Sequence, residues 1–235
     1  MTVALIWAAL TPTLDQANAV AHAIEARYQH ARTLKAIFYE RYSDGAGGES
    51  SESGTVYFSR PGRMRWDYES PEKKLFLVDG QNVWFYVPAD HTVSRAKLKE
   101  SSDWRTPLAL LTGKADLGKL CSKIELMRPA PASAPVPAGL GGHPATQPQL
   151  LDPNDALLKC TPRAEPVEGS NAVFLETNPA GDLTHLTIRE PGNAETEFRF
   201  GNWEQNISIP ESQFHFQPPP GVSVVDEDSL AGEVH

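Results

Sequence analysis

The spacing of hydrophobic residues changes once near the start of the chain, around residue 31. Before that point apolar side chains recur every three or four positions, which is the period of a helix with one buried face. After it, residues 33–43 alternate, with Leu34, Ala36 and Phe38 on one face of a predicted strand. The helical stripe consists of Leu14, Ala17, Val20, Ile24, Tyr28 and Ala31. The pattern therefore predicts an N-terminal helix over residues 13–31, followed by strands.

Short alternating runs bounded by turn residues fill most of the remaining chain. Proline closes several runs, and Asp79-Gly80 is typical of a hairpin turn. The glycine- and serine-rich stretch 44–54 predicts a long, loose hairpin loop. The expected strands are 55–61, 63–71, 73–80 and 82–88, then 156–162, 171–178, 184–191, 195–202, 203–210 and 214–225. This order predicts a mainly β protein with helices (α+β class), built as one curved antiparallel sheet or incomplete barrel.

Two segments interrupt the strand series. Residues 107–112 form a predicted helix of about one and a half turns, with Thr106 as N-cap and Gly113 as stop. Such a short helix needs an apolar surface to lie on. Residues 128–153 are rich in proline, alanine and glycine and predict a flexible insertion. We expect a single domain over 13–226 that contains this insertion, with a disordered tail at 227–235.

The first twelve residues allow two interpretations. Residues 3–10 are an apolar run of the length found in export signals, and residues 17–19 have the form of a cleavage site. No Lys or Arg precedes the run, although export signals normally begin with positive charge. Residues 1–12 are therefore either the remnant of a signal peptide or a disordered, apolar N-terminus.

Composition and charge exclude several classes of function. The chain of 235 residues is 40% hydrophobic and carries a net charge of −9. Proteins that follow nucleic-acid phosphates are usually basic, so no nucleic-acid partner is expected. No motif for a nucleophilic serine, a zinc protease or a phosphate loop is present. Glu195 and Glu197 share one face of a strand and are interpreted as an exposed edge. We expect binding rather than catalysis, and neither cofactor nor metal.

The chain has two cysteines, Cys121 and Cys160, and their spacing fits no zinc motif. In an exported protein an even number of cysteines favours a disulfide. Two separate buried thiols remain the alternative. The two cysteines flank the proline-rich insertion.

The aromatic strands between residues 55 and 88 predict an apolar cavity. In residues 82–88 both faces of the strand are apolar, so both must be covered. Large, flexible side chains of this kind suit an adaptable apolar site. The expected lining, closed by the short helix, is Phe38, Val56, Phe58, Met64, Trp66, Trp84, Tyr86, Leu108 and Leu111.

Arg60 differs from its neighbours Arg63 and Arg65. The latter two share the opposite, polar face of their strand, whereas Arg60 follows Val56 and Phe58 on the apolar face. A buried guanidinium is costly unless it is hydrogen-bonded. Arg60 is either a strand-end side chain that reaches solvent or a polar anchor within the apolar hollow.

Taken in order, "SRPGRMRWDY", "LVDGQNVWFYVP", "PLALLTG" and the terminal "FHFQPPPGVSVV" resemble the outer-membrane lipoprotein carrier family. The resemblance spans residues 13–226. It implies a monomeric periplasmic carrier whose open barrel, covered by lid helices, binds the acyl chains of lipoproteins. It implies two partners, an inner-membrane lipoprotein-releasing ABC transporter complex and an outer-membrane lipoprotein receptor.

Residue by residue, the resemblance places Arg60 at the arginine that hydrogen-bonds the lid, and residues 107–112 at a lid helix. It places Met64 and Trp66 at inward, lipid-facing positions, although an aromatic residue is common in place of Met64. The insertion and the cysteine pair are not general features of the family. The alternatives are a related open-barrel domain that senses lipids and regulates a partner, and an enzyme of unknown type.

Overall fold

A computed structural model of the protein describes residues 14–98, 111, 116–127, 150–163 and 172–227. Within them, one long helix leads into a series of strands. The helices are α1 (Leu14–Gln29), η1 (Pro88–Asp90), α3 (Leu117–Leu120), η2 (Pro191–Asn193) and η3 (Glu211–Phe214). The strands are β1 (Thr33–Ser43), β2 (Glu49–Ser59), β3 (Arg63–Ser70), β4 (Lys74–Val78), β5 (Asn82–Val87), β6 (Thr92–Lys97), β7 (Cys121–Met127), β8 (Ala156–Pro162), β9 (Ala172–Thr177), β10 (Leu183–Arg189), β11 (Glu195–Gln205) and β12 (Ser223–Glu227).

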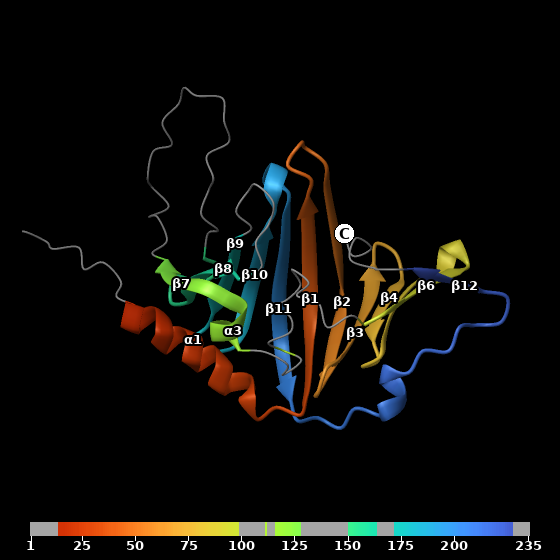
Figure 1. Cartoon of the computed structure of the whole chain (residues 1–235), viewed down its shortest axis with the longest axis horizontal. Coiled ribbons are helices and arrows are strands. Elements are labelled where there is room, and N and C mark those ends of the chain that lie inside the picture. The colour runs from red at the N-terminus through yellow and green to blue at the C-terminus, as the bar shows by residue number, and fades with distance from the viewer. Residues whose placement is uncertain (1–13, 99–110, 112–115, 128–149, 164–171, 228–235) are drawn as a thin grey trace, which may run out of the picture.

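All strands of the described residues belong to one sheet (Figure 1). Its order is β12-β6-β5-β4-β3-β2-β1-β11-β10-β9-β8-β7. The two halves of the chain meet where β1 pairs with β11, with Phe38 opposite Phe200. The predicted fold class, a mainly β protein built as an open antiparallel sheet, is confirmed. One pair departs from it, because β12 runs parallel to β6.

The β1–β2 hairpin is tighter than the sequence suggested. The predicted long loop 44–54 shrinks to a turn over residues 44–48, and β2 begins at Glu49. Asp44 closes the turn by accepting hydrogen bonds from the backbone N–H groups of Ala46 and Gly48. The serine-rich residues continue the ladder, with Ser43 opposite Glu49. The small, polar residues 49–54 were therefore wrongly predicted to form a loop. They form a strand because they pair with β1.

One face of the sheet, here called the inner face, packs against α1 and carries the main hydrophobic core. α1 buries Ala17, Ala21, Ile24 and Tyr28 against this core. Ala17, Ile24 and Tyr28 were predicted to be buried, whereas Leu14 was wrongly included, because it lies at the start of the helix and is 71% exposed. The Tyr28 hydroxyl accepts the backbone N–H of Leu183 at 2.8 Å, which fixes the helix to β10. Leu111 and Leu117 bury against the same core.

The opposite face, here called the outer face, is covered in two places. Over β4–β6 the C-terminal segment 206–222 packs through Ile209, Phe214, Phe216 and Val222. Over β8 and β9 a smaller cluster contains Leu157, Ala172 and Phe174, with Met127 and Leu150 packed against it. The outer face is therefore a partly buried surface rather than a uniformly solvated one.

Gly54 allows an aromatic contact on the inner face. It lies opposite both Phe38 and Tyr68 in its two neighbouring strands. A Cβ at this position would fall 1.9 Å from the backbone oxygen of Asp67. With no side chain between them, the rings of Phe38 and Tyr68 meet with centroids 5.0 Å apart.

Several sequence expectations fall on residues that the structure does not describe. These are the N-terminal residues 1–12, the part of the insertion at 128–149, and the tail from residue 228. Glu227, expected in the tail, belongs to β12. Among the described residues, no helix has the length and apolar character needed to cross a membrane.

Candidate ligand-binding face

Aromatic side chains from β1, β2, β3 and β11 form the centre of the inner face. Trp66 contacts Phe38 at 4.7 Å, Phe198 at 5.4 Å and Phe58 at 6.3 Å between ring centroids. Strand alternation explains the gathering, because these residues occupy equivalent inward positions on neighbouring strands. The result is a large, buried aromatic cluster on the inner face, and its apolar side chains suit contact with hydrocarbon chains rather than with polar ligands.

The structure brings most of the predicted lining residues together on this face. Phe38, Val56, Phe58 and Trp66 are buried in the main core, and Met64 packs against it. Leu111 belongs to the same cluster and is fully buried. Leu108 and the rest of the expected helix 107–112 lie outside the described residues.

Trp84 and Tyr86 were wrongly placed in this lining. Both lie on the outer face, where they contact Phe216 of the C-terminal segment at 5.7 and 5.4 Å. Their neighbours Val83 and Phe85 pack against the inner core instead. Because both faces of β5 are apolar, its sequence alone could not show which two of these four side chains face the inner core.

Arg60 lies at the end of β2, where the inner face meets the C-terminus of α1. Its Nε donates to the carbonyl oxygen of Leu111 at 3.2 Å, and its Nη1 donates to that of Gln29 at 3.3 Å. Gln29 is the last residue of α1, so its carbonyl lacks a partner within the helix and lies at the helix's negative end. Burial lowers the pKa of Arg60. One guanidinium thus joins β2, α1 and Leu111.

The two arginines on the next strand face the other way, as expected, but they are not simply solvated. Arg63 pairs with Glu211 at 2.9 Å and stacks over Phe214. Arg65 donates to the carbonyl oxygen of Gln213 at 3.1 Å. Both therefore hold η3 against the outer face of β3.

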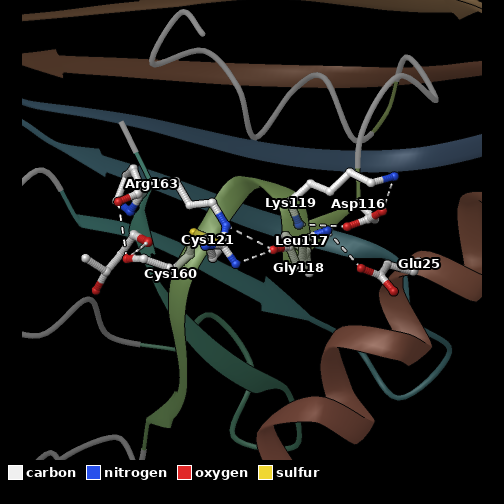
Figure 2. The surroundings of a disulfide bond; sticks show 11 residues. Glu25, Asp116, Leu117, Gly118, Lys119, Cys121, Cys160 and Arg163 are labelled. Atoms are coloured by element: carbon white, nitrogen blue, oxygen red, sulfur yellow. Dashed lines mark hydrogen bonds and ion pairs between the residues drawn. A yellow bond between two sulfur atoms is a disulfide. The ribbon is translucent and has the colours of Figure 1, made fainter. Parts of the chain in front are cut away.

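Cys121 and Cys160 form a disulfide with an S–S distance of 2.04 Å (Figure 2). It joins β7 to β8 directly after the short helix α3. That helix has further ties, since Glu25 of α1 accepts the backbone N–H of Leu117 at 2.8 Å. Arg163 donates twice to the carbonyl oxygen of Gly118. Residues 117–121 are thereby held to α1 and to the sheet.

Sequence reasoning missed a polar group on the inner face. Glu40, Glu52, Tyr68 and Lys74, here called the inner polar patch, come from β1, β2, β3 and β4. Tyr68 donates its hydroxyl to Glu40 at 2.9 Å, and Lys74 pairs with Glu52. Strand parity was a usable signal, because Glu40 follows Leu34, Ala36 and Phe38 at even positions.

Sequence reasoning also misplaced Glu197. It was expected on an exposed edge, but β11 lies between β1 and β10, and Glu197 is buried. It pairs with His185 at 2.9 Å, and with Arg41 and Arg199. No three His, Cys, Asp or Glu side chains of the described part are grouped so that they could hold a metal ion.

The described residues therefore form a single-sheet protein whose apolar inner face carries the main core, with α1, Leu111 and Leu117 packed on it. A family model described as the outer membrane lipoprotein carrier protein LolA matches residues 29–128. The outer-membrane lipoprotein carrier protein of Dechloromonas aromatica is 30% identical over 224 residues, covering 93% of both chains. That of Nitrosospira multiformis is 29% identical over 202 residues, covering 85% of this chain and 84% of the relative.

The chain belongs to the outer-membrane lipoprotein carrier family, which confirms the resemblance found in the sequence. Among solved structures, an uncharacterized conserved protein of Thermus thermophilus shares the fold, with a TM-score of 0.50 at 10% identity. The alignment covers 90% of this chain and 99% of that one.

Proposed function

We propose that the protein is a periplasmic carrier that binds the acyl chains of lipoproteins on its inner face. It accepts cargo from an inner-membrane lipoprotein-releasing ABC transporter complex and passes it to an outer-membrane lipoprotein receptor. It works as a monomer and as a carrier rather than an enzyme. The disulfide supports the periplasmic assignment, because such bonds persist in oxidising compartments.

The observation that carries the proposal is the position of Arg60. Its guanidinium connects α1 and Leu111, both packed on the inner face, to the strand that bears Val56 and Phe58. In this role Arg60 is a latch that holds the cover over an unloaded apolar surface. Acyl chains that enter must separate the cover from the sheet and break these hydrogen bonds.

A latch also answers an energetic requirement of a carrier. Each buried methylene contributes about 0.8 kcal/mol, so two full acyl chains would bring the affinity near the non-covalent limit. A carrier bound that tightly could not release its cargo. Closing the cover again, with Arg60 returning to two carbonyl groups, favours release at the receptor.

The test compares Arg60→Leu with Arg60→Lys and with Arg65→Leu as a matched control. Arg65 also donates to a backbone carbonyl, but on the outer face. A hydrogen bond from a charged group contributes roughly 1.5–3 kcal/mol. Arg60→Leu should therefore retain lipoprotein and slow its transfer by about tenfold or more. Arg60→Lys should be intermediate, because it keeps the charge and loses the planar fork.

The measurement is transfer of a labelled lipoprotein from each purified variant to acceptor protein. We expect Arg65→Leu to transfer like the parent. Transfer by Arg60→Leu at the parent rate would contradict the latch. A parent protein that purifies with a partner protein and never with acyl lipid would contradict the carrier itself.

A further inference from the structure

The inner polar patch lies at one end of an otherwise apolar surface. Glu40, Glu52, Tyr68 and Lys74 all point to the inner face, as do their neighbours Phe38, Trp66 and Phe76 in the same strands. Glu40 pairs across the ladder with Glu52 on one side and with Phe198 on the other. The patch is therefore continuous with the aromatic surface.

Burial makes the patch unusual for a sheet surface. Glu40 is 1% exposed and Tyr68 is 3% exposed. The Lys74 and Glu52 side chains are 15% and 11% exposed. Charged groups at such depth are costly and are rarely kept unless they are paired or functional. Here they interrupt a face on which apolar side chains would suit a purely hydrocarbon ligand.

The patch and Arg60 mark opposite ends of the inner face. Glu52 and Arg60 are separated by eight residues along β2, or about 26 Å at the usual rise of a strand. Val56 and Phe58 are the buried apolar residues between them. An amphiphile that lies along the strands thus has hydrocarbon contacts in the middle and one polar region at each end.

The charges of the two ends differ in kind. Arg60 offers only N–H donors, which attract carbonyl and anionic oxygen atoms. The patch contains two carboxylates, one ammonium and one phenol, and its carboxylates accept hydrogen bonds from N–H groups. The patch is therefore suited to a ligand that has an N–H group next to its acyl chains.

We propose that the inner polar patch binds the N–H group at the polar junction of the acylated cargo, with Glu40 as its acceptor. The N–H group belongs either to a free ammonium or to an amide at the lipidated terminus. Contact with Glu40 sets the direction in which the cargo lies along the strands. This proposal rests on the carrier function above, since it concerns ligands of the same face.

The experiment uses single-chain amphiphiles of equal chain length and opposite charge, hexadecylammonium and hexadecanoate. Their binding is followed by displacement of a fluorescent acyl probe from the full-length protein. Glu40→Gln removes the charge and keeps an oxygen that accepts the Tyr68 hydroxyl. We expect it to weaken hexadecylammonium binding by about tenfold, the effect of losing a charge-assisted hydrogen bond. Binding of hexadecanoate should be unchanged or tighter.

Two further variants separate the subsite from general damage. Tyr68→Phe keeps the ring and removes the hydroxyl that positions Glu40, so it should weaken hexadecylammonium binding by a smaller factor. Glu204→Gln makes the same chemical change at a side chain that is 48% exposed, and should alter neither ligand. Thermal unfolding of each variant checks that the fold is intact.

Lipopeptides distinguish the two sources of the N–H group. A diacylated lipopeptide has a free ammonium, and a triacylated one has an amide in its place. A larger loss for the diacylated form in Glu40→Gln assigns the patch to the ammonium, and a larger loss for the triacylated form assigns it to the amide N–H. Equal losses show that the patch accepts either N–H group. If Glu40→Gln binds both amphiphiles and both lipopeptides like the parent, the subsite is wrong while the carrier function stands. If the parent binds no acylated ligand, the carrier function itself is wrong.

Discussion

His185 lies between two buried carboxylates on the outer face of the sheet. Its Nδ1 is 3.2 Å from Glu176 Oε2, and its Nε2 is 2.9 Å from Glu197 Oε1. Arg41 and Arg199 also contact Glu197, at 2.9 and 2.7 Å. The same strands, β10 and β11, add Arg189 and Glu195, which pair with each other. The imidazole therefore lies in a connected set of charges from β1, β9, β10 and β11.

The directions of the pKa changes follow from these contacts. Burial disfavours the charged form of His185, but hydrogen bonds to Glu176 and Glu197 outweigh it and raise the pKa of His185. The hydrogen bond from His185 and those from Arg199 and Arg41 lower the pKa of Glu197, against the effect of burial. The folded state thus favours protonated His185 and ionised Glu197.

This network predicts a stability that depends on pH. The contribution of His185 is complete below about pH 6.5 and is lost as the pH rises through its raised pKa in the folded state. The contribution of Glu197 is complete above about pH 4.3 and is lost as the pH falls. His185→Leu removes a partner that two buried carboxylates share. Because Glu197 keeps Arg41 and Arg199, the cost should be at the lower end of about 3–5 kcal/mol or below it.

Urea unfolding of the parent and of His185→Leu from pH 4 to 9 measures the effect. The difference in free energy of unfolding should be largest between about pH 4.5 and 6.5 and decrease above that range. His22→Gln changes a histidine whose side chain is 79% exposed, and should show no such difference. A constant difference across the whole range would contradict the charged-network interpretation.

At the scale of elements, the contacts that attach the short helix α3 to α1, β7 and β8 matter most for Arg60. Glu25 ties α3 to α1, and Arg163 and the disulfide tie it to the end of β8 (Figure 2). α3 follows Leu111 closely in the chain, and Leu111 provides one of the two carbonyls that Arg60 contacts. A latch needs a fixed base, and these contacts supply it.

Removal of the disulfide should weaken that base. The bond joins residues 39 apart, and closing a loop of that size stabilises a protein by about 3–4 kcal/mol. Replacing both cysteines with alanine should lower the free energy of unfolding by up to that amount. A reductant should destabilise the parent and leave the double variant unaffected.

Thiol counting under non-reducing, denaturing conditions gives an independent check. We expect no free thiol in the exported parent protein. Two reactive thiols per chain would contradict the disulfide. Equal stability of the parent and the double variant under oxidising conditions would show that the bond contributes nothing to the fold.

At the scale of the whole molecule, pairing of β1 with β11 joins strands from both halves of the chain in one sheet, which predicts a single domain. Residues from before and after the insertion contribute to one core on the inner face. The insertion departs from β7 and returns to β8, which are antiparallel neighbours, with Met127 opposite Leu157. The strands on either side of the insertion therefore pair directly with each other.

Replacing residues 128–149 with a short glycine-serine linker tests this unity. Loop closure depends weakly on length, so the free energy of unfolding should change by about 1 kcal/mol. We expect a single cooperative unfolding transition and unchanged lipoprotein transfer. Two transitions would contradict a single domain, and loss of transfer with an intact fold would assign the insertion a part in handing over cargo.

The periodic features of this molecule were determined by its sequence alone. Helical spacing placed Ala17, Ile24 and Tyr28 on the buried face of α1, and alternation placed Phe38, Phe58 and Trp66 on one face. Alternation also separated Arg60 from Arg63 and Arg65. These predictions succeed because one repeating geometry decides which side chains share a face.

The tertiary structure decided the features that depend on which strands pair with each other and on which segments cover each face of the sheet. Trp84 and Tyr86 became outer residues because the C-terminal segment covers that side of β5. Glu197 became buried because β1 and β10 flank its strand, and the serine-rich residues 49–54 became strand because β1 pairs with them. Glu40 shares the parity of Phe38, but its contact with Tyr68 needs three strands in register. Alternation assigns a side chain to a face, whereas only the assembled sheet supplies its cover and its partners, and those set the free energy of burying a charge.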